Sequence, residues 1–407
     1  MKKSLMRKYA RLLVKSGVNI QKGQQLNIIT DVEAADFVNI LAEEAYRAGA
    51  GKVQVDWSST ELTKLAYRHR TVRSLCEVPD WQVEKAKHES EILPARIRLI
   101  CEDPDGLRKV NADKLQKANI AASKLLKPYR DAMDNKHQWL VCAIPGKAWA
   151  KKMFPSDRTS VAVEKLWDAI LKTVLCDENN DPIEAWNKKN DSFREKCEWL
   201  NKMNFDYLHF KSANGTDFKC ELMKESVWCG GGETTLNGVY FNPNMPTEEI
   251  FTTPMKGKCE GRLVSAMPLS VRGTLIENFY IDFKDGRAVE WHAEKGEEAL
   301  GKIITTDEGS RMLGELALVP KDSPIAESGL LYYNTLFDEN ASCHVALGMG
   351  YSNCVKGFEN MTADELHELG VNDSMIHVDF MVGSKDFTVT GYKDGVTIPI
   401  FIDGKWA

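Results

Sequence analysis

The stretch QLNIITDVEAADFVNILAEEAYRAGAGKVQVDW, residues 25–57, contains a strand pattern, a helix pattern and a second strand pattern, in that order. QLNIIT (25–30) is a short apolar run typical of a buried strand. VEAADFVNILAEEAYRAGAG (32–51) carries apolar residues at helical spacing and ends in glycines that suit a helix C-cap. KVQVDW (52–57) alternates apolar and polar residues, as a strand does. The order predicts a βαβ unit within an α/β domain.

Downstream of this unit the sequence continues the same α/β pattern. ARIRLI (95–100) and QWLVCAI (138–144) are further strand patterns. Two helix patterns, at about 157–175 and 183–202, follow them, and the second is dense in Lys, Glu, Asn and Trp. We therefore predict an α/β N-terminal domain that spans residues 1–203.

From Phe205 onward the pattern changes to short alternating runs separated by turns. Asn214-Gly215 lies between two such runs, and Asp285-Gly286 lies between two more. Both dipeptides favour the tight turns of β-hairpins. We predict that residues 204–407 form a β-rich α+β domain, and this half also carries the candidate metal ligands.

Length and composition indicate a globular protein. The 407 residues are 43% hydrophobic and 28% charged, and a chain of this length favours two domains. A net charge of −6 and a pI near 5.9 argue against nucleic-acid or anionic-membrane partners, and no apolar run is long enough to span a bilayer. Ten cysteines without a Cys-x-x-Cys pair favour free thiols, which suits a cytoplasmic location.

Several common active-site motifs are absent or incomplete. GAGKV (49–53) lacks the leading glycine and the hydroxyl residue of a phosphate-binding loop. HELGV (367–371) has valine where a zincin has its second histidine, so a solvated helix surface explains it better. No Gly-x-Ser-x-Gly sequence occurs, which argues against an α/β-type serine hydrolase.

The segment HVDFMVGSKD, residues 377–386, places ionisable groups in a strand pattern. Because side chains alternate along a strand, His377 and Asp379 should share one face, about 7 Å apart at Cα, while Val378 and Phe380 line the other. Burying an imidazole beside a carboxylate is costly unless a divalent metal or local hydrogen bonds compensate. An ordinary hydrogen-bonded pair on a half-exposed strand remains the alternative.

Other acidic and imidazole residues in the last third favour the metal interpretation. LFDENASCHVALGMGY (336–351) resembles a loop that offers ligands, and LGELALVP sets Glu315 in an apolar strand pattern. NMPTEEIFTTP holds Glu248 and Glu249, for which capping or surface roles are the alternative. Oxygen-rich ligation with a few imidazoles suits Zn, Mn, Co or Mg. Cys343 is expected in the core. The residues of the 336–351 segment with ligating or catalytic side chains are Asp338, Glu339, His344 and Tyr351.

Five motifs, in this order, resemble those of the aminopeptidase T, aminopeptidase S and PepS family of metallopeptidases, also called the thermophilic metalloprotease family. They are NMPTEEIFTTP, LGELALVP, LFDENASCHVALG, GMGY and HVDFMVGS. The resemblance covers the whole chain in length and layout and is close from about residue 240 onward.

The resemblance implies a site with two divalent metal ions (Zn, Co, Mn or Mg). It implies Tyr351 as the catalytic phenol and Glu315 as a catalytic, bridging carboxylate, and it favours Glu249 over Glu248. The implied metal ligands are Glu249, Glu315, Glu339, His344, His377 and Asp379.

The activity implied by the resemblance is that of a metallo-aminopeptidase. Such an enzyme uses a water activated by two metals to remove the first residue of peptides with a free N-terminus, and the family forms homodimers. Two alternatives remain open: a two-metal phosphoesterase, and a degenerate, non-catalytic metal-binding protein. A phosphoesterase would be expected to bring Arg or Lys to the phosphate, and only Lys356 and Lys385 lie among the ligand motifs.

Overall fold

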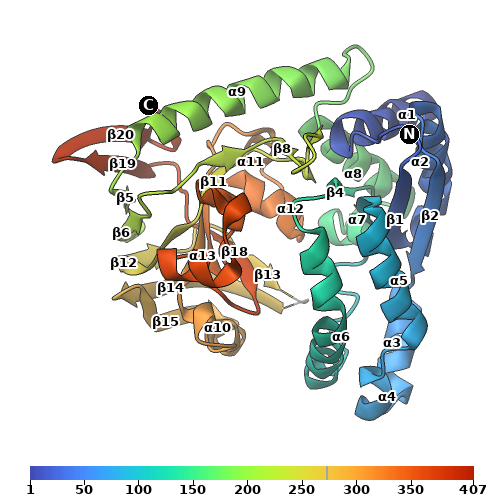
Figure 1. Ribbon diagram of the computed structural model, residues 1–407, viewed down its shortest axis with the longest axis horizontal. Helices are drawn as coiled ribbons and strands as arrows, with labels where there is room; N and C mark the ends of the chain where they lie inside the picture. The colour runs from blue at the N-terminus through green and yellow to red at the C-terminus, as the bar shows by residue number, and fades with distance from the viewer. Residues whose placement is uncertain (272–273) are drawn as a thin grey trace. The chain divides into compact units, whose positions relative to one another are not determined.

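The chain divides into two compact units in the computed structural model, which describes residues 1–271 and 274–407 (Figure 1). The first unit contains residues 1–187 and 232–245, and the second contains residues 188–231 and 246–407. This two-unit layout of helices and sheets agrees with the predicted fold class. The division into domains at residues 203 and 204 stays a prediction.

The first unit contains a parallel sheet with strand order β10-β4-β3-β1-β2. The predicted βαβ unit is confirmed, because β1 precedes and β2 follows helix α2 (Ala35–Ala48) in the chain, and the two strands pair in parallel. Helix α2 ends at Gly49, whose φ of 108° is the left-handed C-cap conformation that glycine adopts readily. The strands are β1 (Gln25–Asp31), β2 (Lys52–Ser58), β3 (Ala95–Ile100), β4 (Trp139–Ala143) and β10 (Asn244–Met245).

Helices of the first unit pack on this sheet through apolar faces. Tyr9, Phe37 and Trp167, from three different helices, form one buried aromatic cluster with ring centroids 5.7 to 6.4 Å apart. Within the described residues, no helix combines the length and apolar character needed to cross a membrane. The helices besides α2 are α1 (Lys3–Leu12), α3 (Thr60–His69), α4 (Val72–Cys76), α5 (Asp80–Ile92), α6 (Ala112–Met133), α7 (Lys147–Met153) and α8 (Thr159–Thr173); α9 (Pro182–Met203) continues into the second unit.

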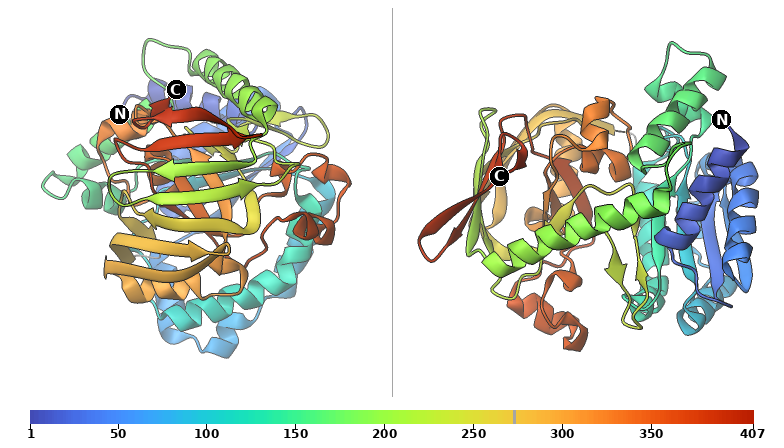
Figure 2. Two further views of the ribbon diagram at one scale, coloured as in Figure 1. Left: turned by 90° about the vertical axis from the view of Figure 1, so that its left-hand side faces the viewer. Right: turned by 90° about the horizontal axis from the view of Figure 1, so that it is seen from above.

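The second unit contains a nine-stranded antiparallel sheet, whose strands lie side by side on the left of Figure 2. Both predicted hairpins are confirmed: β5 pairs with β6 across Asn214-Gly215, and β14 pairs with β15 across Asp285-Gly286. Asp285 and Gly286 have φ of 50° and 72°, as a two-residue hairpin turn of this hand requires. The strands are β5 (Tyr207–Lys211), β6 (Asp217–Leu222), β12 (Pro254–Val264), β13 (Leu269–Val271), β14 (Thr274–Lys284), β15 (Arg287–Lys295), β19 (Thr388–Lys393), β20 (Val396–Ile402) and β21 (Lys405–Trp406).

A five-stranded antiparallel sheet, in the order β18-β17-β16-β11-β7, packs one face against the nine-stranded sheet. Phe380 of the smaller sheet and Phe279 of the larger one contact each other with ring centroids 5.5 Å apart, and Leu316 and Val345 lie in the same core. The strands are β7 (Cys229–Gly230), β11 (Ile250–Thr252), β16 (Leu313–Leu318), β17 (His344–Gly348) and β18 (His377–Met381).

The register of this smaller sheet places polar side chains on the face away from that core. Glu315 pairs with Ala346, Ala346 pairs with Asp379, and Gly348 pairs with His377. Paired residues of neighbouring strands share a face, and successive residues along a strand alternate between faces. The predicted ligands on β16, β17 and β18 therefore lie on one surface, while their neighbours in sequence fill the core.

A β-bulge at Gly314 sets the direction of Glu315. In a regular strand, residues two apart face the same side. Leu313 pairs with Leu347 and lies in the core, whereas Glu315 faces away from it, because the register shifts between the two residues. A Cβ built on Gly314 would lie 2.2 Å from the carbonyl oxygen of Met349. Only glycine fits at the position that turns Glu315 away from the core.

We expect Gly314→Ala to destabilise the protein by about 1–3 kcal/mol, as overpacking does in cores. The added methyl group would contact the carbonyl oxygens of Gly348 and Met349, both of which are backbone atoms. Urea unfolding of the metal-free protein measures the change. An unchanged midpoint would mean that the bulge accommodates a side chain without moving Glu315.

The prediction that residues 336–351 form a loop is wrong. The segment contains a helical turn, α12 (Thr335–Asp338), a 3-10 turn, η4 (Glu339–Ala341), and then strand β17; only Ser342, Cys343 and the last residues lie outside regular structure. The Asn334 side chain caps the helical turn by accepting a bond from Leu336 N–H. The other helices of this unit are α10 (Glu297–Ile304), α11 (Pro324–Ser328) and α13 (Ala363–Leu369).

Candidate metal centre

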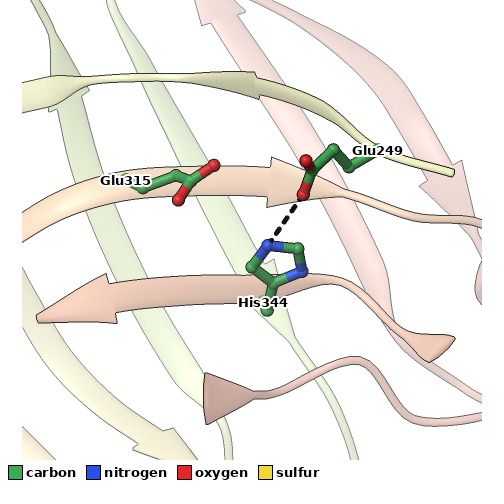
Figure 3. A group of neighbouring side chains, drawn as sticks. All are labelled: Glu249, Glu315 and His344. Atoms are coloured by element: carbon green, nitrogen blue, oxygen red, sulfur yellow. Dashed lines mark ion pairs between the residues drawn. The ribbon is translucent and has the colours of Figure 1, made fainter. Parts of the chain in front are cut away.

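One group of buried side chains on this sheet face contains Glu249, Glu315 and His344 (Figure 3). One ligand atom from each residue lies within 4.8 Å of the others. His344 Nε2 is 3.1 Å from Glu249 Oε2. Glu249 directly precedes β11, Glu315 lies on β16 and His344 begins β17, so three adjacent segments of one sheet supply the group.

A second group contains Glu315, His377 and Asp379, again within 4.8 Å of one another. His377 Nε2 lies 3.0 Å from Glu315 Oε2 and 3.3 Å from Asp379 Oδ1. His377 and Asp379 share one face of β18, as predicted from strand alternation. Glu315 belongs to both groups, so two potential cation positions share this one carboxylate.

Glu339 lies beside these groups but outside both of them. Its buried carboxyl group has a pKa raised well above the usual value, first by desolvation and then by the charges of Asp379 and Glu249. The Glu339 carboxyl group, in the η4 turn, is therefore close enough to interact electrostatically with residues of both groups. Of the six predicted ligands, five form the two overlapping groups and the sixth adjoins them. Their ligand roles stay a prediction.

Backbone carbonyl groups orient both imidazoles. His344 Nδ1 lies 3.2 Å from the carbonyl oxygen of Ser342, and His377 Nδ1 lies 2.7 Å from that of Met349. A carbonyl oxygen only accepts, so each Nδ1 carries the hydrogen and donates it. Each Nε2 is then directed at carboxylates, the arrangement in which a histidine binds a metal through Nε2 and is held through Nδ1.

The charges around these atoms are unbalanced in favour of carboxylates. Burial raises the pKa of Glu315 to about 7, even though the bond from His377 opposes the shift. Burial disfavours a charged His344, but the bond to Glu249 and nearby carboxylates outweigh it and raise its pKa to about 10. Both pKa shifts favour the protonated forms of Glu315 and His344.

Asp379 supplies a further observation that fits a cation. Its buried Oδ1 accepts no regular hydrogen bond from the residues that the structure describes, although His377 lies nearby. Burial acts to raise the pKa of Asp379, but His377 together with His344 and Glu315 outweighs burial and lowers it. A buried, ionised oxygen without a well-directed hydrogen bond is costly. The donor set of carboxylates and neutral imidazoles therefore fits divalent metal ions.

Tyr351 borders the second group. Its hydroxyl lies 3.1 Å from His377 Nε2, and its ring makes an edge contact with Phe251, with centroids 5.4 Å apart. Thr253 Oγ1 accepts a bond from the backbone N–H of Tyr351. Burial and the charge of Glu315 raise the phenol pKa well above its usual value. The hydroxyl stays protonated at neutral pH and can donate a hydrogen bond.

The neighbouring acidic residues and Cys343 have other contacts. Asp338 accepts bonds from the backbone N–H groups of Tyr332 and Asn334, which places it in the local turn. Cys343 lies in the core, as predicted. The surface or capping role considered for Glu248 is wrong, because its largely buried carboxylate lies 2.6 Å from Nζ of Lys189.

Two polar residues outside the predicted set, one fully and one largely buried, contact these segments. One is Lys189 on α9, and the other is Asn340, whose side-chain oxygen accepts a bond from the backbone N–H of Glu248. Their sequence context shows no sign of this, because Lys189 lies in a charge-rich helix pattern and Asn340 in a segment that resembles a loop.

Comparisons with known proteins agree along the full chain. A model of the thermophilic metalloprotease family, M29, matches residues 2–406. Aminopeptidase AmpS from Bacillus subtilis (strain 168) is 40% identical over 401 residues, which cover 98% of this chain and 97% of the relative. Aminopeptidase 2 from Geobacillus stearothermophilus is 41% identical over 402 residues, with the same coverage. The solved structure of wild-type AmpT from Thermus thermophilus matches with a TM-score of 0.91 and 37% identity, covering 100% of this chain and 99% of that chain.

Proposed function

Since this chain belongs to the thermophilic metalloprotease family M29 and is a metallo-aminopeptidase, we propose that it removes the N-terminal residue of peptides with two divalent ions and an activated water. The observation that carries this proposal is the position of Glu315 in both ligand groups. One shared carboxylate is the arrangement expected where two ions lie a few ångströms apart.

The donor set supports a two-ion site. Two divalent ions carry four positive charges, which match the four carboxylates Glu249, Glu315, Glu339 and Asp379. Oxygen ligands with two imidazoles suit Zn, Co, Mn or Mg. When bound, such ions polarise the scissile carbonyl and lower the pKa of a water molecule.

The chain's own residues supply positioning and hydrogen bonds. Once His377 Nε2 is used for ligation, the phenol of Tyr351 loses this hydrogen-bond partner and can donate to the oxyanion that forms at the scissile carbonyl. The free α-amino group of a peptide would bind at one of the ions or at a nearby carboxylate, which would account for an exopeptidase rather than an endopeptidase. Glu315, which belongs to both ligand groups, would hold both ions.

The phosphoesterase alternative receives no support from the contacts of this cluster. For the five residues of the two groups, the described partners within ion-pair distance are one another's carboxylates and imidazoles, without an arginine or lysine to hold a phosphate. The nearby Lys189 binds Glu248.

Location and assembly follow as further parts of the proposal. The ten cysteines, all of them described, are free thiols, which suits the reducing cytoplasm. A homodimer is proposed from the family resemblance alone.

Removal and return of metal tests the proposed function. After treatment with a chelator, the protein should lose hydrolysis of leucine p-nitroanilide, and activity should return on adding Co, Zn, Mn or Mg singly. The returning activity should saturate near two equivalents of the best ion, because two groups share Glu315.

Two matched substrates sharpen this experiment. N-acetyl-leucine p-nitroanilide should not be hydrolysed, because it lacks the free amino group, and p-nitrophenyl phosphate reports the phosphoesterase alternative. Saturation at one equivalent would contradict the two-ion proposal. Hydrolysis of the phosphate ester alone would contradict the peptidase proposal.

A further inference from the structure

A hydrogen bond joins the two chain segments that carry Glu249 and Glu339. The backbone N–H of Glu248 donates to Asn340 Oδ1 at 2.6 Å. Glu248 directly precedes Glu249, and Asn340 directly follows Glu339. The bond therefore links residues adjacent to two proposed ligands.

The side chain of Asn340 is held on both of its polar atoms. It is fully buried, and its Nδ2 donates to the carbonyl oxygen of Leu336 at 3.0 Å. The backbone carbonyl of Asn340 accepts a bond from Ser323 Oγ, also at 3.0 Å. Because a backbone N–H only donates and a carbonyl only accepts, these partners leave one possible orientation of the amide.

The other end of the link is also fixed. The Glu248 carboxylate accepts a bond from Lys189 Nζ at 2.6 Å, and about nine-tenths of each side chain is buried. A buried ion pair adds little net stability, but it restricts geometry when both partners are present. Glu248 is thus held at its side chain by Lys189 and at its backbone N–H by Asn340.

We propose that Asn340 is a positioning residue, which holds the Glu249 and Glu339 segments at the spacing that ion binding requires. This inference rests on the proposed function, in which both glutamates are ligands. Carboxylates repel one another before cations bind, so the protein must hold these segments together by other bonds. The short amide of Asn340 does so without adding charge to a site that already has excess carboxylate.

The test compares metal affinity in Asn340→Leu and in the unmodified full-length protein. Leucine keeps a similar volume but removes the bonds to Glu248 and Leu336. Titration of the metal-stripped protein with Co²⁺ in a calorimeter should show affinity weakened by about 10- to 100-fold, the loss typical when a group that orients metal ligands is removed. At saturating Co²⁺, KM for leucine p-nitroanilide should stay near that of the unmodified protein.

Asn242→Leu is the matched control. Asn242 is also buried, and its Nδ2 donates to the carbonyl oxygen of Ser16 within the first unit. This variant should lose comparable thermal stability but keep its Co²⁺ affinity. Equal loss of affinity in both variants would overturn the proposal, because the effect would then follow from stability alone.

Asn340→Asp tests the contributions of the two amide bonds separately. It also provides a test of the proposal if the leucine variant does not fold. It keeps an acceptor for Glu248 N–H but cannot donate to Leu336 when ionised. The proposal predicts Co²⁺ affinity weaker than that of the unmodified protein and, where the leucine variant folds, stronger than that of the leucine variant. Affinity as low as that of Asn340→Leu, or unchanged affinity in every Asn340 variant, would overturn it. Failure of the proposed function would appear differently, as one-ion binding or absent peptidase activity in the unmodified protein.

Discussion

Glu315→Gln is expected to eliminate binding of both metal ions and to lower kcat/KM by more than about 1,000-fold, beyond the 10- to 100-fold typical of residues that only orient ligands. Glu315 is the one residue common to both ligand groups. An amide in place of its carboxylate removes the negative charge that would attract both ions. Metal content after gel filtration, measured by emission spectroscopy, together with leucine p-nitroanilide hydrolysis, gives the result.

The fold should survive this substitution. Glutamine has nearly the same shape, and the buried carboxyl group it replaces has a pKa raised to about 7 by desolvation. Removing that charge should not destabilise the metal-free protein.

Two histidine variants are the matched controls for this prediction. His344→Ala changes only the first group and His377→Ala only the second, so each should affect one ion more than the other. If Glu315→Gln retained one tightly bound ion while either histidine variant lost both, Glu315 would not be the shared ligand.

Tyr351→Phe is expected to keep both metal ions and lower kcat by about 100- to 1,000-fold, the cost of removing one donor to an oxyanion. The phenol is held protonated by burial and by the charge of Glu315, and its hydroxyl already lies 3.1 Å from His377 Nε2. Since the proposed hydrogen bond strengthens only as negative charge develops, KM should change little.

Tyr280→Phe is the control for loss of a phenol hydroxyl elsewhere. Tyr280 lies on β14 of the nine-stranded sheet, where its hydroxyl donates to Glu290 at 3.0 Å. This variant should retain full activity. A Tyr351→Phe enzyme with unchanged kcat would remove the phenol from the mechanism, and one that lost metal would give Tyr351 a structural role instead.

Local patterns were sufficient to predict most elements near the site. Period-two alternation in residues 377–382 correctly predicted that His377 and Asp379 share a face and that Phe380 packs in the core. The Asp285-Gly286 hairpin was also predictable, because only a few residues tolerate two consecutive positive φ angles.

Local patterns failed where long-range contacts decide the outcome. Residues 336–351 have the small and polar composition of a loop, yet β17 forms there because β16 and β18 pair with it on both sides. Glu248 has the sequence context of a surface residue, but Lys189 of α9 makes its burial possible. Local periodicity carries no information about a partner so distant in sequence.

The amino-acid sequence by itself determined the types of side chain available for a metal site, their order along the chain and the family resemblance, because these depend on residue identity and short-range alternation. Only the tertiary structure decided that Glu315 belongs to both ligand groups, that Glu339 lies beside them, and that Asn340 links the segments of Glu249 and Glu339. The physical reason is that strand register, the bulge at Gly314 and buried hydrogen bonds are set by pairing between segments far apart in sequence.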